Sequence, residues 1–192
     1  MATKRSRRGA QAAELGIGLV GTRFMGRAHA NAWRQAPCFF DLKRRPRLRC
    51  VAGRDRAATR AFAERWEVAA TAATWEALVR DPVVQLVDVL TPNHLHAQHV
   101  IAAAERGKHV IVEKPMALRL DDADRMISAC DRAGVKLFVV KQNRYNLPIQ
   151  KLHQAIERGR FGKLVLGTVR VRWCRDQKYY SQDGWRGTWA MD

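Results

Sequence analysis

Two charged residues, Glu113 and Lys114, directly follow a short apolar run at residues 109–112 and precede Pro115. A carboxylate and an ammonium at the end of a buried strand, with a proline to stiffen the turn, have the composition of an acid–base site. A partly desolvated lysine can help to remove a proton from a hydroxyl group while hydride leaves the neighbouring carbon. Lys114 is therefore the candidate catalytic residue, and an ordinary surface lysine in a turn is the alternative.

The preceding residues are organised to place this pair. An apolar run at residues 86–90 predicts a buried strand, and Asn93 is expected to cap the helix that follows, which Gly107 ends. Residues 109–112 then predict a second strand. A strand, a helix and a strand in about thirty residues form a βαβ unit, the repeat of a parallel sheet.

Polar side chains are expected to meet at the carboxyl edge of this sheet, where open α/β folds bind ligands. The set comprises Asn93, His94, His96, Glu113, Lys114, Gln142, Asn143 and Arg144. We assign His96, Glu113, Lys114 and Gln142 to cofactor binding, and Lys114, Asn143 and Arg144 to substrate binding.

A glycine pattern precedes these elements. Residues 16–21 match GxGxxG, but they lie within a predicted strand at residues 14–20, where glycines cannot hold a phosphate. The physically sensible fingerprint follows the strand and opens a helix, and its candidate cofactor-binding residues are Gly21, Thr22, Arg23, Phe24, Met25 and Gly26. Gly21 permits a tight turn, and Gly26 permits close packing of helix on strand. Arg23 replaces the middle glycine, and it either pairs with a phosphate or crowds it.

The second predicted strand, at residues 48–52, is followed by Gly53, Arg54 and Asp55. An acid at this position binds the ribose 2′-hydroxyl of NAD, whereas an arginine accommodates the 2′-phosphate of NADP. Arg54 favours NADP and Asp55 keeps NAD possible, so the cofactor is NAD or NADP. A plain turn before the next helix is the alternative interpretation.

The remaining pattern alternates strands and helices, which predicts an α/β fold with a doubly wound parallel sheet. The expected helices span residues 24–36, ended by Pro37, then 57–66, 75–79 after a Thr74 cap, and a helix capped by Asp121 and ended by Gly134 with Ala123, Met126, Ile127 and Cys130 on one face. A last strand is expected at residues 136–140. His29, on the first helix, is interpreted as a polar residue near the packed face rather than a ligand.

The pattern changes after residue 145. A helix is predicted at residues 148–158 and a β-rich run at residues 164–173. We therefore expect a basic disordered leader at 1–13, a dinucleotide-binding domain at 14–145, and at 146–192 the start of a second, sheet-based α+β domain, truncated in this chain.

Composition narrows the function. The 192 residues carry a net charge of +17, but the arginines are spread along the chain, so we predict no nucleic-acid partner. No apolar run is long enough to span a membrane, and four scattered cysteines favour the cytoplasm. His94, His96 and His99 have a spacing that suits no common zinc site, so no metal is expected.

Three motifs resemble the glucose–fructose oxidoreductase, inositol dehydrogenase and rhizopine-catabolism (Gfo/Idh/MocA) oxidoreductases. They are LVGTRFMGRAHA, VDVLTPNHLHAQHVIAAAERGKHVIVEKPMAL and KQNRYNLPIQKLHQAIERGRFGKLV. The resemblance implies a Rossmann domain followed by an open mixed sheet, an NAD(P) cofactor, hydride transfer at a sugar or cyclitol carbon, and a homo-oligomer. It implies that Lys114 lies near the reacting hydroxyl, that Thr91, Pro92, Asn93 and Glu113 line the cofactor, and that Trp185 and Arg186 reach back toward it.

The two ends of the chain resemble different subfamilies. The C-terminal third is similar to UDP-N-acetylglucosaminuronate 3-dehydrogenases, and the N-terminal third to MocA-type dehydrogenases of free sugars or cyclitols. The family's catalytic histidine belongs to a stretch expected after Asp192, so we expect weak or no turnover from these 192 residues. A non-catalytic dinucleotide sensor or an inactive fragment is the alternative from another class.

Overall fold

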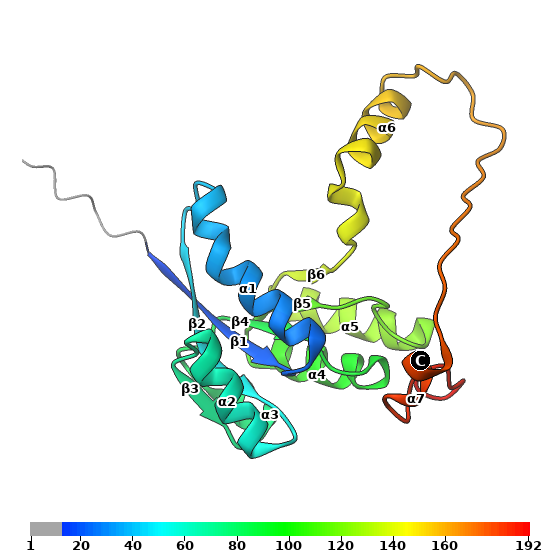
Figure 1. Ribbon diagram of the computed structural model, residues 1–192. Helices are drawn as coiled ribbons and strands as arrows, with labels where there is room; N and C mark the ends of the chain where they lie inside the picture. Colours follow the sequence, from blue (N-terminus) through cyan, green and yellow to red (C-terminus); the bar gives the residue numbers. More distant parts are fainter. Residues whose placement is uncertain (1–12) are drawn as a thin grey trace, which may run out of the picture.

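The computed structural model describes residues 13–192, so the predicted leader lies, apart from residue 13, outside the described residues. Six parallel strands form one sheet in the order β3-β2-β1-β4-β5-β6 (Figure 1). The strands are β1 (Glu14–Val20), β2 (Arg45–Ala52), β3 (Ala70–Ala72), β4 (Leu86–Val89), β5 (His109–Val112) and β6 (Leu137–Val139). The order reverses between β1 and β4, and this confirms the prediction of a doubly wound sheet.

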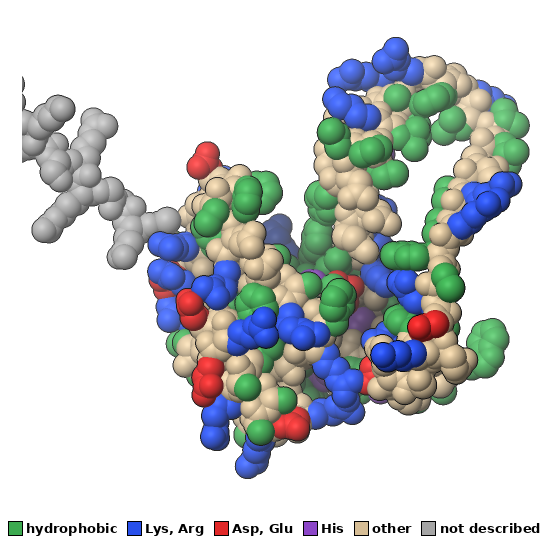
Figure 2. Space-filling model, in the orientation of Figure 1, with side chains coloured by type: hydrophobic (Ala, Val, Ile, Leu, Met, Phe, Trp, Pro, Cys, Tyr) green, Lys and Arg blue, Asp and Glu red, His purple; other side chains and the backbone are tan. Residues whose placement is uncertain are grey.

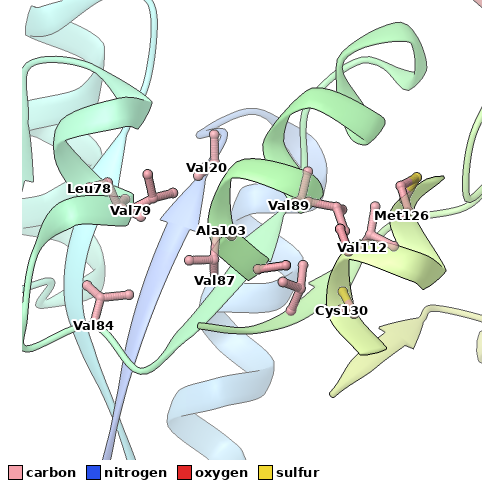
Figure 3. Close-up of a cluster of buried hydrophobic side chains, with 14 of the residues drawn as sticks. Val20, Leu78, Val79, Val84, Val87, Val89, Ala103, Val112, Met126 and Cys130 are labelled. Atoms are coloured by element: carbon pink, nitrogen blue, oxygen red, sulfur yellow. The ribbon is translucent and has the colours of Figure 1, made fainter. Parts of the chain in front are cut away.

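Helices cover both faces of the sheet. They are α1 (Phe24–Phe39), α2 (Arg56–Trp66), α3 (Trp75–Arg80), α4 (His96–Glu105) and α5 (Leu120–Arg132). One buried cluster joins Ala30 of α1 and Phe62 of α2 to Ile17 of β1. The other joins α3, α4 and α5 to the opposite face, where Val87 and Val112 are fully buried (Figure 3). Each face of the sheet therefore has its own apolar layer.

Local capping signals explain where several helices begin and end. The Asp55 carboxylate accepts a hydrogen bond from the Ala58 N–H at the start of α2, and the Thr74 hydroxyl accepts one from Ala77 at the start of α3. Gly107 has a φ of +69° directly after α4, a left-handed conformation that favours glycine at a helix end.

Three of the predicted helix stops and caps were wrong, strand β2 begins at Arg45 rather than at residue 48, and the short strand β3 was not predicted. Helix α1 continues through Pro37 to Phe39, because a proline in the last turn removes only one helical hydrogen bond. Asn93 does not cap α4, since it lies within a short 3₁₀ helix, η1 (Asn93–Leu95), that precedes it. Asp121 does not cap α5 either; it lies in the first turn, where a carboxylate favours the helix dipole.

The buried face of α5 also differs from the expected one. Met126 and Cys130 are buried as predicted, but Ala129 completes the buried face and Ile127 is 45% exposed. A residue one position away from Met126 points about 100° around the helix. The stripe that packs on the sheet is therefore rotated away from Ile127.

Residues after β6 leave the sheet. They form η2 (Gln142–Tyr145), α6 (Leu147–Glu157), an extended stretch and α7 (Gln177–Ser181), which returns to the sheet domain (Figure 1). The predicted strand at residues 164–173 was wrong, because these residues pair with no other strand in the described part of the chain. A strand is defined by its ladder of hydrogen bonds, and β propensity alone does not supply one. Val165 and Val169 are 89% and 88% exposed.

Candidate functional site

The glycine turn lies at the carboxyl end of β1, beside the point where the strand order reverses. Gly21 has a φ of +123°, and a Cβ atom there would lie 2.7 Å from the Leu90 carbonyl oxygen. A Cβ atom on Gly26 would lie 2.4 Å from the Gly21 carbonyl oxygen, so α1 packs tightly against the turn. No side chain of residues 13–192 caps helix α1. Its first N–H groups are thus free of side-chain partners and suited to bind a pyrophosphate.

By contrast, the glycines at positions 16 and 18 are packing glycines. A Cβ atom on Gly16 would overlap the Val83 carbonyl oxygen, and one on Gly18 would lie 2.7 Å from a Leu78 methyl carbon. Both lie within β1 and line no turn. The motif at residues 21–26 is therefore the one placed to hold a phosphate.

Arg23 occupies the N-cap position of α1 with a φ of −78°, a conformation open to any residue. Its exposed guanidinium forms an ion pair with Asp183, from the C-terminal segment. Phe24 is 69% exposed, whereas Met25 packs against the buried cluster under α1. The side chain at position 23 is thus directed toward the C-terminal segment.

At the end of β2, Gly53 is required by packing, since a Cβ atom there would lie 2.4 Å from Thr59 Oγ1 and 3.2 Å from Thr22 Oγ1. Arg54 is exposed. One carboxylate oxygen of Asp55 caps α2, 2.9 Å from the Ala58 nitrogen. The acid therefore has a structural partner, as expected of a turn before a helix.

Thr91 and Pro92 follow β4, and two buried histidines support their loop. His96 is fully buried, and its two ring nitrogens each lie 2.9 Å from a carbonyl oxygen, Thr91 O and Pro115 O. Burial lowers the pKa of His96, so the neutral ring donates to one carbonyl at a time. Burial likewise lowers the pKa of His99 to about 4, and its Nδ1 lies 3.1 Å from Thr91 Oγ1. His96 thus joins the two loops that follow β4 and β5.

The turn after β5 contains a cis peptide bond between Lys114 and Pro115. Glu113 is only 6% exposed, and its Oε2 accepts a hydrogen bond from the Lys114 backbone N–H at 3.0 Å. Lys114 itself is exposed. The partial desolvation on which its chemistry was expected to depend is therefore not supplied by the described residues.

Sequence reasoning missed the most extensive polar cluster of the site. His29 Nδ1 lies 2.9 Å from Asp88 Oδ2, and His29 Nε2 lies 3.0 Å from Glu113 Oε1. Burial alone would lower the pKa of His29, but hydrogen bonds to the two carboxylates outweigh it and raise the pKa to about 9. A signal was present, because Asp88 is an acid inside an apolar strand and such an acid needs a partner.

Trp185 and Arg186, which the resemblance predicts to reach back toward the cofactor, lie in a compact cluster with Tyr179. The Arg186 guanidinium lies 4.8 Å from the Trp185 ring centre and 4.6 Å from that of Tyr179. The neighbouring Asp183 contacts Arg23, and Asp192 Oδ1 accepts a hydrogen bond from Asn93 at 2.8 Å. The segment that contains Trp185 and Arg186 thus lies beside the glycine turn and the loop after β4.

Gln142, Asn143 and Arg144 lie in η2, which follows β6 at the same edge of the sheet. All three are exposed, and no hydrogen bond within residues 13–192 joins them to Lys114. The structure therefore brings them to the expected edge without assembling them into one site. A cavity of about 360 Å³ lies at this edge, lined by Asn93, His94, Ala97, Ala117, Leu118, Arg119, Asp122, Trp189 and Ala190.

Two other features of the described residues bear on function. Among residues 13–192, no three His, Cys, Asp or Glu side chains gather into a metal-binding group. The same residues contain no helix long and apolar enough to cross a membrane. On the face shown in Figure 2, Lys and Arg side chains are dispersed over the surface rather than joined in one basic patch.

A parallel sheet with its order reversed between β1 and β4, and a glycine turn opening α1 at that point, define a dinucleotide-binding domain of the Rossmann type. Residues 15–141 match GFO_IDH_MocA, described as "Oxidoreductase family, NAD-binding Rossmann fold", and the chain belongs to this family.

Individual relatives differ in their substrates. The chain is 33% identical to levoglucosan dehydrogenase of Pseudarthrobacter phenanthrenivorans over 165 residues, which cover 84% of this chain and 42% of that protein. It is 42% identical to myo-inositol 2-dehydrogenase of Thermotoga maritima over 86 residues, or 45% of this chain and 26% of that protein. The chain thus spans less than half the length of these curated relatives.

A solved structure extends the similarity further along the chain. The WlbA dehydrogenase of Bordetella pertussis, in complex with NADH and UDP-GlcNAcA, superposes with a TM-score of 0.85 at 36% identity. The superposition covers 93% of this chain and 53% of that one. It therefore includes residues beyond the sheet domain.

Proposed function

We propose that this chain is the cofactor-binding part of an NAD-dependent oxidoreductase that transfers hydride between a sugar-ring carbon and the nicotinamide. The observation that supports it most is that the glycine turn opens α1 at the reversal point of the sheet, and that His29 of the same helix bonds to Glu113 in the turn after β5, at the same edge of the sheet. A helix N-terminus without a side-chain cap from residues 13–192 suits the pyrophosphate, and the Lys114 ammonium suits the acid–base half of the reaction. NAD, when bound, supplies the hydride acceptor.

Different residues are proposed to bind the cofactor and to assist proton transfer. Gly21, Gly26 and the first N–H groups of α1 hold the pyrophosphate, and the loop of Thr91, Pro92 and Asn93 lines the cofactor. We propose that Lys114, in the turn after β5, assists loss of the hydroxyl proton as the hydride leaves the same carbon. We propose that Trp185 and Arg186 close over the cofactor, supported by the contact of their segment with Arg23.

A nucleotide sugar, such as a UDP-N-acetylhexosaminuronate oxidised at C3, is the substrate class that we favour. The superposition on WlbA includes 93% of this chain, whereas that on levoglucosan dehydrogenase includes 78%. Residues 146–192 are therefore proposed to belong to a second, substrate-binding domain that also mediates oligomer contacts. A free sugar or a cyclitol is the alternative substrate, supported by the relatives that act on levoglucosan and myo-inositol.

A cofactor titration tests this proposal. Quenching of tryptophan fluorescence by NADH, and then by NADPH, should saturate for the purified chain. Gly26→Ala should abolish quenching, because the new methyl group would overlap the Gly21 carbonyl. Gly167→Ala is the matched control, since no atom of residues 13–192 lies within 4 Å of its Cβ position. Failure of the wild-type chain to bind either nucleotide would contradict the proposal, and equal binding by Gly26→Ala would contradict the assigned turn.

A substrate screen then separates the sugar classes. With the cofactor bound, UDP-sugar acids should change the fluorescence further, while levoglucosan and inositols should not. The opposite preference would favour the free-sugar alternative. Binding of the cofactor with no response to any sugar would favour a non-catalytic dinucleotide-binding role.

A further inference from the structure

His29 lies between two carboxylates in a geometry that determines its charge. Its Nδ1 is 2.9 Å from Asp88 Oδ2, and its Nε2 is 3.0 Å from Glu113 Oε1. A carboxylate only accepts hydrogen bonds, so each ring nitrogen must donate to satisfy its partner. Only the imidazolium carries two N–H groups, and the arrangement is therefore that of a positively charged ring.

The row of hydrogen bonds continues at both ends. Trp33 Nε1 donates to Asp88 Oδ2 at 2.8 Å, and the Lys114 backbone N–H donates to Glu113 Oε2 at 3.0 Å. One continuous network thus connects α1, the middle of the sheet and the backbone of the candidate catalytic lysine.

The network is shielded from water. Asp88 is fully buried, Glu113 is 6% exposed, and the His29 side chain is 16% exposed. Asp88 and Glu113 are the charged groups that face the ring, from β4 and from the turn after β5. Their hydrogen bonds overcome the effect of burial and raise the pKa of His29 to about 9, so the ring is charged at neutral pH. A buried carboxylate left without this partner would be strongly unfavourable.

The Lys114 side chain has no such support. Within residues 13–192, no hydrogen bond or ion pair holds its Nζ atom, and the residue is exposed. Its placement is therefore determined by its backbone, which Glu113 holds.

We propose that His29 is a positioning residue for Lys114. It holds the Glu113 carboxylate, which in turn holds the Lys114 amide. The turn at residues 113–115 therefore keeps a fixed position relative to the glycine turn at residues 21–26, which ends three residues before His29 on α1. The consequence for hydride transfer rests on the proposed function, whereas the network itself does not require a bound cofactor.

The first experiment follows the His29 ring carbon Cε1 by NMR during a pH titration of the full chain without cofactor. The midpoint should lie near pH 9 and should fall by about one pH unit in Glu113→Gln, which removes one charge. His153→Gln, an exposed histidine on α6, is the matched control and should leave the midpoint unchanged. A midpoint near 6.5 in the wild-type chain would overturn the proposal.

The second experiment measures hydrogen exchange at two adjacent amides in His29→Gln. The Lys114 amide bonds to the Glu113 side chain, whereas the Glu113 amide bonds to the Val89 carbonyl in the sheet. Exchange at Lys114 should accelerate about tenfold, because its amide loses roughly one net hydrogen bond. Exchange at Glu113 should stay unchanged. Equal acceleration at both, or none at either, would overturn the proposal. If His29→Gln does not fold, Glu113→Gln carries the same comparison between positions 114 and 113.

NADH binding then separates the two proposals. His29→Gln should weaken NADH binding, because the glycine turn and the turn at residues 113–115 lose their fixed relative position. His153→Gln should leave NADH binding unchanged, and tryptophan quenching measures both. A wild-type chain that does not bind NADH would overturn the proposed function. The pH titration and the hydrogen-exchange measurement, both made without cofactor, would still test the role of His29. Unchanged NADH affinity in a folded His29→Gln chain would overturn the coupling of the two turns.

Discussion

Helices α5 and α6 have similar lengths and similar amphipathic patterns, yet they have opposite environments. On α5, Met126 is fully buried and Cys130 is 2% exposed, whereas on α6 Leu152 and Ile156 are 48% and 40% exposed. The difference lies in the partner: α5 packs on the sheet beside α4, and α6 has no sheet beneath it in the described residues. An apolar stripe therefore suffices to predict a helix, but burial requires a second surface.

The same contrast separates the two halves of the candidate site. The cofactor side consists of loops that follow buried strands. His29 joins α1 to the turn after β5, and His96 joins the loops after β4 and β5. The proposed substrate side, represented by Asn143 and Arg144, is exposed, and no hydrogen bond within residues 13–192 links it to Lys114. Dinucleotide binding is therefore expected of residues 14–145, whereas the proposed sugar recognition is expected to need additional surface.

The largest expected effect compares the two helices directly. Met126→Ala should lower the free energy of unfolding by about 2–5 kcal/mol, because it leaves a cavity between α5 and the sheet. Leu152→Ala should change it by less than about 0.5 kcal/mol, since its side chain stays half exposed. Urea denaturation followed by circular dichroism measures both. A similar cost for the two substitutions would show that α6 packs against a surface after all.

The next effect concerns the pH dependence of the sheet domain. Because the pKa of His29 is raised from 6.5 to about 9, its stabilisation is fully present below pH 6.5 and is lost as the pH rises through 9. The loss is on the order of 3 kcal/mol. Burial raises the pKa of the Cys50 thiol to about 11, which reduces stability only above about pH 9.

Urea midpoints at pH 6.5, 8 and 9, compared between wild type and His29→Gln, isolate the contribution of His29 to the stability of the fold. The difference in stability between the two proteins should shrink as the pH rises. A difference that is constant over this range would show that the His29 charge does not stabilise the fold.

A smaller effect separates two helix caps with the same chemistry. Asp55 accepts from Ala58 at the start of α2, and Asp176 accepts from Tyr179 at the start of α7, both at 2.9 Å. Asp55→Ala should cost about 1 kcal/mol of global stability. Asp176→Ala should leave the main unfolding transition unchanged, because α7 lies outside the sheet core. Equal losses would mean that the C-terminal segment unfolds together with the sheet.

The smallest effect is expected where the two regions touch. Arg23 and Asp183 join the glycine turn to the C-terminal segment, and the Arg23 side chain is 69% exposed. A double-mutant cycle with Arg23→Ala and Asp183→Ala should give a coupling energy below about 1 kcal/mol, and salt should reduce it. A larger, salt-insensitive coupling would show that the segment is an integral part of the domain.

Much of this architecture was predictable from local patterns. Strands β1 and β5 have the predicted bounds, and the glycine turn lies where a strand ends and a helix begins. The errors occur where local signals compete. Pro37 is tolerated in the last turn of α1, and Asn93 entered a 3₁₀ helix instead of capping α4. Residues 164–173 have β propensity, but no strand lies beside them in the part of the chain that the structure describes.

The site shows the same limit. Glu113 and Lys114 could be selected from type and spacing, but the partner of Glu113 lies 84 residues earlier in the chain, at His29. No periodicity connects positions so far apart. The acid at position 88 indicated that a partner was needed, without indicating which one.

The sequence by itself determined most of the alternation of strands and helices in residues 14–140, the glycine turn and the family to which the chain belongs, because each depends on residues close together along the chain. The tertiary structure alone decided the charge of His29, the solvent exposure of Lys114 and the pairing of Arg23 with Asp183. These properties depend on which groups the packed sheet brings within a few ångströms and on how far it excludes water from them.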